Sequence, residues 1–403
     1  MRRPAVIFIL ITMMIDAMGI GLIIPVLPDL FQEVGAVNLS TAALWGGALS
    51  TVFALMQFVF GPVIGGLSDR FGRRPVLLLS LVVMALDYLV MAVAGSLWLL
   101  FLGRIVGGIT SATQATANAY MADISTPEDR AANFGLIGAA FGIGFVLGPL
   151  MGGLLAEFGT RAPFYAAAAL SGANAIFGYF VLKETLALEN RRRFEWRRAN
   201  PLGSFRHLKS LPGLGALLLV FFIYQVAFSV YPAVWSFFGK ERFGWEPSTI
   251  GMSLALFGIM LAIVQGGLIR PVMRLLGERG TVIYGHAFDI MAFLALAFVT
   301  SGTLALILTP LAALAAVITP ALQGIMSKAV GPDAQGELQG ALASLTALAM
   351  ILSPLLMTST FAAFTGPDAL IYFPGAPFVL SAFLILLGLM AFTARRRQRS
   401  FSG

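Results

Sequence analysis

Five ionisable residues lie within long apolar stretches of this sequence, and they are the residues best placed to do chemistry. They are Asp16, Asp87, Arg104, His286 and Asp289. A charged side chain at the centre of a bilayer costs about 2.5–3.5 kcal/mol on insertion scales. Such residues are therefore expected to face a water-filled cavity inside a helical bundle rather than lipid.

The excess of acids over bases in this set bears on what the set does. One reading is structural, with buried ion pairs such as Asp87 with Arg104. The other is functional, because an unpaired carboxylate in apolar surroundings can hold a proton near neutral pH and exchange it for a cationic substrate. Three carboxylates against one arginine favour function, and Asp289 is the first choice for the proton carrier.

His286 precedes Asp289 by three residues, which places both side chains on one face of a helix. Two readings stay open. His286 either titrates together with Asp289 or is a histidine with satisfied hydrogen bonds near a helix end.

The composition predicts an all-α membrane protein. Of the 403 residues, 58% are hydrophobic and 11% are charged, whereas soluble proteins carry about 25% charged residues. Because each span needs about 20 residues, the length accommodates about twelve spans, and no room is left for a soluble catalytic domain of about 50 residues or more. We expect spans at 4–26, 42–66, 75–95, 98–121, 133–155, 162–182, 213–236, 248–269, 281–300, 302–326, 337–361 and 374–394.

The distribution of basic residues predicts the orientation. With the N-terminus inside, the cytoplasmic segments collect 22 of the 26 lysines and arginines, and Arg104 lies within a span. This bias places both termini in the cytoplasm and favours membrane topology over nucleic-acid binding as the source of the net charge of +7.

The chain is expected to consist of two six-helix bundles, at 1–183 and 213–403, the second ending in a short basic cytoplasmic tail. The basic segment 184–212 is read as a cytoplasmic linker, in which an interfacial helix carrying Phe194 and Trp196 is one possibility. A Gly-Gly-Leu sequence closes the second span at 65–67 and recurs at 266–268, where it closes the eighth. This repeat supports two related halves.

The sharpest motif is the segment Gly65-Gly-Leu-Ser-Asp-Arg-Phe-Gly-Arg-Arg-Pro75. Gly65 is expected to permit close helix approach, Gly72 a positive φ, and Pro75 the first turn of the next helix. Asp69 can pair with an arginine of this loop or with a helix N-terminus. The charge cluster is either a conformational switch or an ordinary positive-inside turn.

This loop resembles the signature loop of the major facilitator superfamily, and the resemblance covers the whole chain. Arg104 with Gly108 resembles a second family motif, although Gly107 stands where many members carry a glutamine. The Gly-x-x-x-Gly-Pro-x-x-Gly-Gly run at 144–153 is similar to the motif of proton-driven drug antiporters, and it is more specific than ordinary small-residue helix packing. The conformational gate then comprises Gly65, Asp69, Arg70, Gly72, Arg73 and Arg74 in the loop, with Gly144, Gly148, Pro149, Gly152 and Gly153 in the fifth span.

Further segments are similar to tetracycline/proton antiporters, at 16–28, 69–80, 86–88, 104–106, 232–235, 242–245 and 320–324. In that family, acids at the positions of Asp16, Asp87 and Asp289 are implicated in handling protons and substrate. One departure concerns the eighth span, where the most similar antiporters carry a histidine and this chain has Leu261. The residues expected to line the substrate cavity are Gln57, Tyr88, Thr113, Gln114, Asn118, Gln225, Trp235 and Gln323.

The resemblance implies a multi-pass protein of a bacterial inner membrane that exports a drug in exchange for protons. Tetracycline, carried as a metal–drug cation, is the leading substrate. It implies no cofactor and no bound metal beyond a divalent cation carried with the drug. Expected partners are the small-molecule drug, protons and membrane lipid, without nucleic acid, and the sequence is compatible with a monomer. The alternatives are an exporter of other drugs, a metabolite/proton symporter, and a membrane enzyme or receptor. No P-loop, zinc motif or cysteine supports the enzyme reading.

Overall fold

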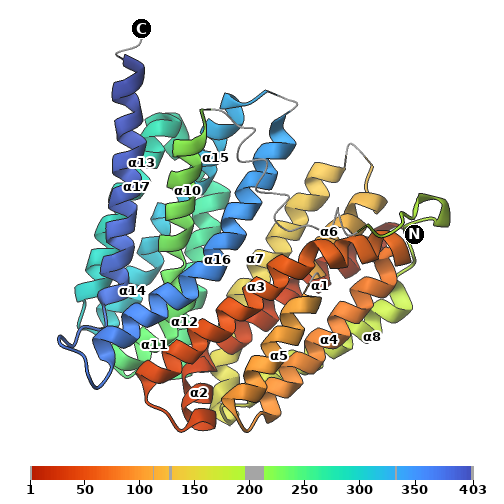
Figure 1. Ribbon diagram of the computed structural model, residues 1–403, viewed down its shortest axis with the longest axis horizontal. Helices are drawn as coiled ribbons and strands as arrows, with labels where there is room; N and C mark the ends of the chain where they lie inside the picture. The colour runs from red at the N-terminus through yellow and green to blue at the C-terminus, as the bar shows by residue number, and fades with distance from the viewer. Residues whose placement is uncertain (1, 112, 127–128, 196–212, 332–333, 401–403) are drawn as a thin grey trace. The chain divides into compact units, whose positions relative to one another are not determined.

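The computed structural model describes the chain apart from residues 1, 112, 127–128, 196–212, 332–333 and 401–403 (Figure 1). Throughout the described residues, the regular elements are all helices. The all-α architecture that the composition predicts is therefore confirmed.

The helices form two compact units. Unit 1 comprises Met1–Val37, Val52–Pro201 and Glu246–Ala255, and unit 2 comprises Asn38–Thr51, Leu202–Trp245 and Leu256–Gly403. Two helices, Leu39–Phe71 and Pro247–Ile263, are thus divided between the units, because their first residues belong to one unit and their remaining residues to the other. The boundaries expected from the sequence, 1–183, 184–212 and 213–403, stay a prediction, and residues 196–212 of the linker lie outside the described part.

Unit 1 is built around one long N-terminal helix. Helix α1 packs along α7 and α8, while α4 runs beside α8 and contacts α5 (Figure 1). Prolines at 25 and 28 end α1 and begin the next helix, since proline cannot donate the backbone hydrogen bond of a helix interior. The helices are α1 (Arg2–Ile23), α2 (Leu27–Gly35), α3 (Leu39–Phe71), α4 (Arg73–Val93), α5 (Leu97–Thr110), α6 (Thr113–Ile124), α7 (Arg130–Leu155) and α8 (Ala162–Val181), with 3₁₀ turns at Ile24–Val26, Ala156–Phe158 and Leu188–Asn190.

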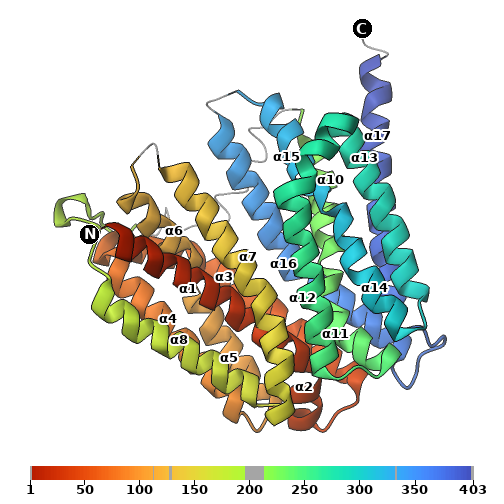
Figure 2. The ribbon, with the colours of Figure 1, turned by 180° about the vertical axis from the view of Figure 1, so that it is seen from behind.

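Unit 2 places its C-terminal helix α17 beside α13 and α10, as both views show (Figures 1 and 2). A π-helical turn, Val264–Leu268, separates α12 from α13 and contains the repeated Gly-Gly-Leu sequence. Such turns often occur at functional sites. The helices are α10 (Gly215–Phe228), α11 (Val230–Phe243), α12 (Pro247–Ile263), α13 (Ile269–Phe298), α14 (Gly302–Ala312), α15 (Ile318–Ala329), α16 (Gln335–Thr365) and α17 (Ala376–Ser400), with a 3₁₀ segment at Ala313–Val317.

Ten helical stretches of the described chain are long and apolar enough to cross a membrane. One of them, Pro247–Phe298, is 52 residues long; it contains the expected span 248–269 and overlaps the expected span 281–300. Within it the backbone leaves helical geometry at Gly277, where φ is +66°. The expected span 98–121 is formed by the shorter α5 and α6, with residue 112 outside the described part. The count of twelve remains a prediction.

The surface is that of a protein solvated by lipid. Large apolar side chains such as Phe180 and Leu79 are 78% and 61% exposed, and many others on the spanning helices are exposed too. A soluble monomer rarely exposes apolar patches beyond a few hundred Å². The apolar exterior therefore agrees with the composition in assigning this chain to the membrane.

Three expectations about the loop at 65–75 and the linker can be compared with the structure. Gly72 has φ +109° and Pro75 lies in the first turn of α4, as predicted. The expectation for Gly65 is wrong for the described residues, because none of their atoms outside its own helix lies within 4 Å of the position of a Cβ there. The close approach occurs one residue later, where the Phe194 ring lies 3.1 Å from the Cβ position of Gly66. Residues 191–195 form no helix, so Phe194 is not part of an interfacial one.

Candidate functional site

The first buried charge pair lies in unit 1, between α4 and α5. The Arg104 Nη1 atom is 3.5 Å from Asp87 Oδ2, and the Asp87 side chain is only 1% exposed. Neither carboxylate oxygen has a hydrogen-bond partner among the described residues. The structural reading of this pair, an ion pair inside the bundle, thus has direct geometric support.

Two glycines of α5 make room for the Asp87 carboxylate. A Cβ at Gly103 would lie 3.0 Å from Asp87 Oδ1, and a Cβ at Gly107 would lie 2.9 Å from Asp87 Oδ2. A longer side chain at position 107 would have to displace the carboxylate. Gly107 therefore leaves the space that the Asp87 carboxylate occupies against α5.

The other neighbours of the Asp87–Arg104 pair include an aromatic ring and a methionine sulfur. The Arg104 guanidinium lies 5.3 Å from the centre of the Phe53 ring, in the range of a cation–π contact, and it also contacts the Met91 sulfur. The Tyr88 hydroxyl fits against Gly19, 2.7 Å from a Cβ built there. Asp16, on the same helix as Gly19, is half-buried and has no ion pair among the described residues.

The second buried acid lies in unit 2, on α13. Asp289 and His286 are both completely inaccessible to solvent, and both Asp289 carboxylate oxygens lack a hydrogen-bond partner in the described part of the chain. The His286 Nδ1 atom is 2.8 Å from the Val282 carbonyl oxygen. The His286 Nε2 atom lies 3.5 Å from the Cβ position of Gly388, on α17, so His286 is held between its own helix and α17.

Aromatic side chains surround this part of unit 2. Tyr224 lies 6.3 Å from His286 between ring centres and stacks on Phe228 at 5.7 Å. Tyr231 contacts Phe257 at 4.9 Å and Phe293 at 5.6 Å. The Tyr231 hydroxyl is buried without a hydrogen-bond partner among the described residues. Asp289 therefore lies in a bundle interior that offers aromatic faces and few hydrogen bonds.

The polar residues predicted to line the cavity divide between the units. In unit 1, Gln57 donates from Nε2 to the Ser111 carbonyl oxygen at 3.3 Å, which brings it to the junction of α5 and α6. The hydroxyl of Thr113 and the amide oxygen of Asn118 are buried there without partners in the described chain, while Gln114 is exposed.

In unit 2, Gln225 donates to the Thr346 hydroxyl at 3.4 Å, and Gln323 is half-buried. Trp235 is 1% exposed and packs against Phe378, Phe238 and Trp245. Its role as a lining residue stays a prediction, although the packing places its ring in the aromatic core.

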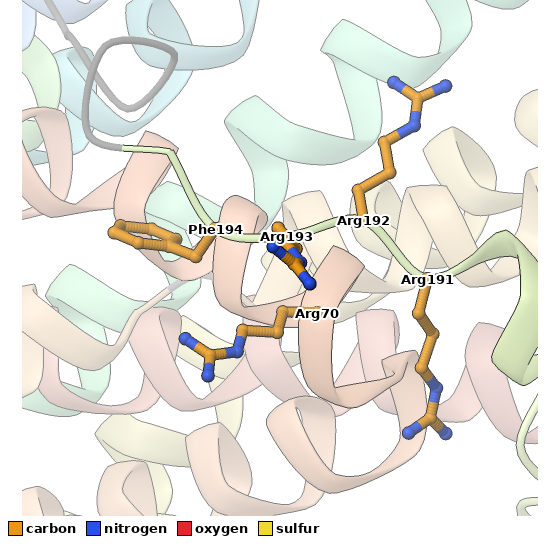
Figure 3. Close-up of a pocket in the computed structure, with 5 residues that line it drawn as sticks. All are labelled: Arg70, Arg191, Arg192, Arg193 and Phe194. Atoms are coloured by element: carbon orange, nitrogen blue, oxygen red, sulfur yellow. The ribbon is translucent and has the colours of Figure 1, made fainter.

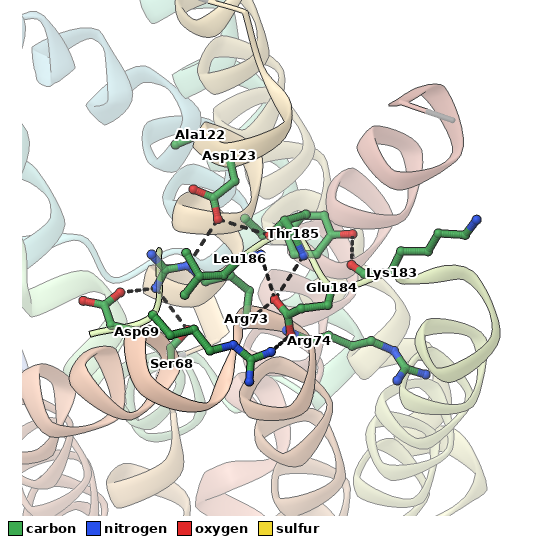
Figure 4. A network of polar contacts seen from close by, with 12 residues as sticks. Ser68, Asp69, Arg73, Arg74, Ala122, Asp123, Lys183, Glu184, Thr185 and Leu186 are labelled. Atoms are coloured by element: carbon green, nitrogen blue, oxygen red, sulfur yellow. Dashed lines mark hydrogen bonds and ion pairs between the residues drawn. The ribbon is translucent and has the colours of Figure 1, made fainter. Parts of the chain in front are cut away.

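The loop between α3 and α4 carries a dense polar network, shown in Figure 4. The Arg73 guanidinium pairs with Asp69 at 2.5 Å and with Asp123, at the end of α6, at 3.3 Å. It also donates to the Ser68 hydroxyl at 3.2 Å. The Arg74 guanidinium donates to the Tyr179 carbonyl oxygen at 2.8 Å. One turn is thereby tied to α6 and α8.

Glu184, just beyond α8, caps helix α4. Its carboxylate accepts the backbone N–H groups of Arg73 at 2.9 Å and Arg74 at 3.3 Å. These donors have no partner within the helix, and a negative charge at a helix N-terminus is favourable. Neither Glu184 nor Asp123 is among the site residues predicted from the sequence. The feature of the sequence that could have indicated them is that each is an acid just after an expected span, on the side of the basic loop.

We expect Glu184→Ala to lower the free energy of unfolding by about 1 kcal/mol, the usual cost of losing a helix cap. Thermal unfolding of the purified protein in detergent measures this. Glu189→Ala removes an exposed carboxylate of the same segment and should change stability by no more than about 0.5 kcal/mol. Equal effects of the two substitutions would show that Glu184 does not act as a cap.

The glycines of α7 allow close packing against α1. A Cβ at Gly144 would lie 2.1 Å from the Met14 carbonyl oxygen, one at Gly148 would lie 2.7 Å from that of Met18, and one at Gly152 would lie 2.1 Å from that of Leu22. On another side of α7, Gly153 has the same relation to the Pro247 carbonyl oxygen, at 2.6 Å. The motif at 144–153 is thus a surface on which two helix backbones pack without intervening side chains.

Apolar helices of spanning length, with ionisable groups buried in each of two units, define a multi-span helical membrane protein. Comparison with known proteins places it more narrowly. The family model described as Major Facilitator Superfamily matches residues 9–354. The chain is 46% identical to the class C tetracycline resistance protein of Escherichia coli over 89% of this chain and 90% of that protein.

It is 44% identical to the class G tetracycline resistance protein of Vibrio anguillarum, over 91% of this chain and 92% of that protein. Among solved structures, a bacterial homologue of the human lysosomal transporter Spinster superposes with a TM-score of 0.81 at 16% identity, covering 98% of this chain and 97% of that one. That likeness concerns the fold alone. The chain belongs to the major facilitator superfamily and, within it, to the family of the tetracycline resistance proteins.

Proposed function

We propose that the protein exports tetracycline in exchange for protons. The relatives that are 44–46% identical over about nine tenths of their length are named for tetracycline resistance, which supports the substrate. The observation that supports proton coupling is that Asp289 is fully buried and that its carboxylate has no hydrogen-bond partner among the described residues.

The proposed exchange follows from the cost of burying a charge. An ionised Asp289 without a partner is unfavourable in an apolar bundle, and either a proton or a cationic drug removes that cost. Because one carboxylate cannot hold both, binding of the drug on one side of the membrane releases the proton there. A proton bound on the other side then displaces the drug. The cargo is a drug cation that carries a divalent metal ion, and we propose no resident cofactor or catalysed covalent step.

The other intramembrane groups take supporting roles in this proposal. Asp87 with Arg104, and Asp16, line the proton and substrate path in unit 1. Gln57, Tyr88, Thr113, Gln114 and Asn118 form the cavity wall of that unit, and Gln225, Trp235 and Gln323 that of unit 2. His286 either shares the proton of Asp289 or only packs between its own helix and α17, with its ring bonded to the Val282 carbonyl oxygen one turn earlier on α13. A single chain suffices for this scheme.

The network around the α3–α4 loop is the proposed gate. Its ion pairs join Arg73 to Asp69 and Asp123, so the turn is held to α6 in the present arrangement. Movement of α6 would break the Arg73–Asp123 pair, and movement of α8 would break the hydrogen bond from Arg74 to the Tyr179 carbonyl oxygen. Either change would release the turn from that helix. In the proposed orientation, with both termini cytoplasmic, this gate faces the cytoplasm.

A second candidate is export of other cationic drugs by the same exchange. Leu261 in place of the family histidine favours it, because a titratable group is missing from α12. His286 is the one histidine of the described spans, and it lies on α13. Substrate identity thus separates the candidates, whereas the coupling mechanism does not.

Drug accumulation in cells tests the proposal. Cells expressing the chain should accumulate less tetracycline than cells with an empty vector, and a protonophore should abolish the difference. Reduced accumulation only of other cationic drugs would favour the second candidate. Efflux that persists with the protonophore would contradict proton coupling.

A further inference from the structure

A positively charged cavity lies beside the α3–α4 turn, within unit 1 (Figure 3). Its volume is about 370 Å³. The described residues that line it are four arginines and one phenylalanine, and none of these lining residues carries a carboxylate. The lining residues are Arg70, Arg191, Arg192, Arg193 and Phe194. The proposed proton and drug path does not use this cavity.

The linker segment that supplies most of this lining is held against the turn by backbone and ring contacts. The Arg192 backbone N–H donates to the Asp69 carbonyl oxygen at 3.1 Å. Two residues further on, the Phe194 ring lies over Gly66, 3.1 Å from the position of a Cβ there. A side chain at position 66 would therefore push the ring away. The cavity thus has a defined floor, made by the turn, and a defined wall, made by the linker.

The charges of the cavity are poorly compensated within the described chain. Arg191 lies 4.0 Å from Glu184, at the limit of an ion pair, and its Nε atom is buried without a hydrogen-bond partner among the described residues. Arg70, Arg192 and Arg193 are exposed. Figure 3 shows the Arg191 and Arg192 side chains pointing to opposite sides of the linker backbone.

Four guanidinium groups around one cavity raise the local positive potential, and an oxyanion with several acceptor oxygens would lower it. The guanidinium group is planar and presents its donors as a fork that matches two oxygens of a phosphate. We propose that this cavity binds a phosphate group, supplied by the headgroup of an acidic phospholipid or by a soluble phosphate. The phosphate would bridge Arg70 of the turn to a linker arginine, and the arginines that point elsewhere would contribute through their charge.

Titration of the purified full-length protein in a neutral detergent tests this site without any measurement of transport. The probes are dioctanoyl-phosphatidylglycerol, dioctanoyl-phosphatidylcholine and inorganic phosphate, and the readout is the thermal unfolding midpoint as a function of probe concentration. The variant R192Q/R193Q removes two exposed charges of the cavity. The control R270Q/R274Q removes two exposed charges of α13 in unit 2.

We expect phosphatidylglycerol to raise the midpoint in a saturable manner and phosphatidylcholine to leave it unchanged. Because each arginine near an anionic headgroup contributes about a fivefold effect, R192Q/R193Q should bind phosphatidylglycerol about thirtyfold more weakly, and R270Q/R274Q should bind it like the parent protein. Saturable binding of inorganic phosphate, with no added gain from the lipid probe, supports the same site with a soluble source.

The proposal is overturned if R192Q/R193Q binds both anionic probes as tightly as the parent. It is also overturned if phosphatidylcholine is as effective as phosphatidylglycerol and phosphate has no effect. The substituted side chains are exposed, and unfolding midpoints without probe show whether the variants retain the parent fold.

Discussion

Vesicles that contain Asp289→Asn in place of the parent protein should release no protons on addition of drug. The substitution preserves the size of the side chain and removes its ability to ionise. Asp289 is fully buried, and its carboxylate oxygens are unpartnered in the described chain, so its charge can be compensated by a proton or by a cation that enters the bundle. With an amide at this position, neither occupant is required, and the exchange loses its driving force.

The measurement is drug-dependent proton release from inverted vesicles, followed with a pH-sensitive dye. We expect Asp289→Asn to give the signal of empty vesicles and Asp289→Glu to retain part of the parent signal. Asp368→Asn changes an exposed acid in the loop before α17 and should match the parent. Drug uptake driven by a pH gradient in Asp289→Asn, at the parent rate, would refute the assignment of the proton carrier.

Removing either member of the Asp87–Arg104 pair should destabilise the protein, but by unequal amounts. Asp87→Asn leaves a buried guanidinium that cannot lose its proton, and an unpaired buried charge costs about 3–5 kcal/mol. Arg104→Gln should cost less, because the Asp87 carboxyl can take up a proton and become neutral. The double variant D87N/R104Q should recover most of the loss caused by Asp87→Asn.

Thermal unfolding of the four proteins in detergent forms a double-mutant cycle, and we expect a coupling energy of about 3 kcal/mol, since the double variant recovers most of the loss. The exposed pair Glu33–Arg161, with 3.1 Å between charged atoms, provides the control. Glu33→Gln should change stability by no more than about 1 kcal/mol. Additive effects at positions 87 and 104 would show that these residues do not act as a pair.

Composition and hydropathy predicted the helical membrane fold because lipid imposes one requirement on every span, an apolar stretch with satisfied backbone hydrogen bonds. The pairing of Asp87 with Arg104 was also foreseeable, since few partners exist inside the bundle. Gly72 and Pro75 behave as their backbone preferences predict. These features depend on local chemistry or on the scarcity of buried charges.

Contacts between residues distant in sequence could not be predicted in the same way. Glu184 caps a helix that begins 111 residues earlier, and nothing in the local pattern identifies the backbone N–H groups that donate to its carboxylate. Gly65 and Gly66 are indistinguishable in sequence, yet only Gly66 is covered, because Phe194 of the linker happens to pack there. Trp235 illustrates the same limit, since a ring in a spanning helix can face a cavity or an aromatic core with equal local sequence.

The most direct test of the account is transport by the purified protein in liposomes under an imposed pH gradient. With an acidic lumen, we predict that external tetracycline accumulates inside against its own gradient while the lumen becomes more alkaline, and that reversing the pH gradient stops the accumulation. Accumulation that instead requires an alkaline lumen would mean that drug and protons move in the same direction. That result would contradict proton exchange at Asp289.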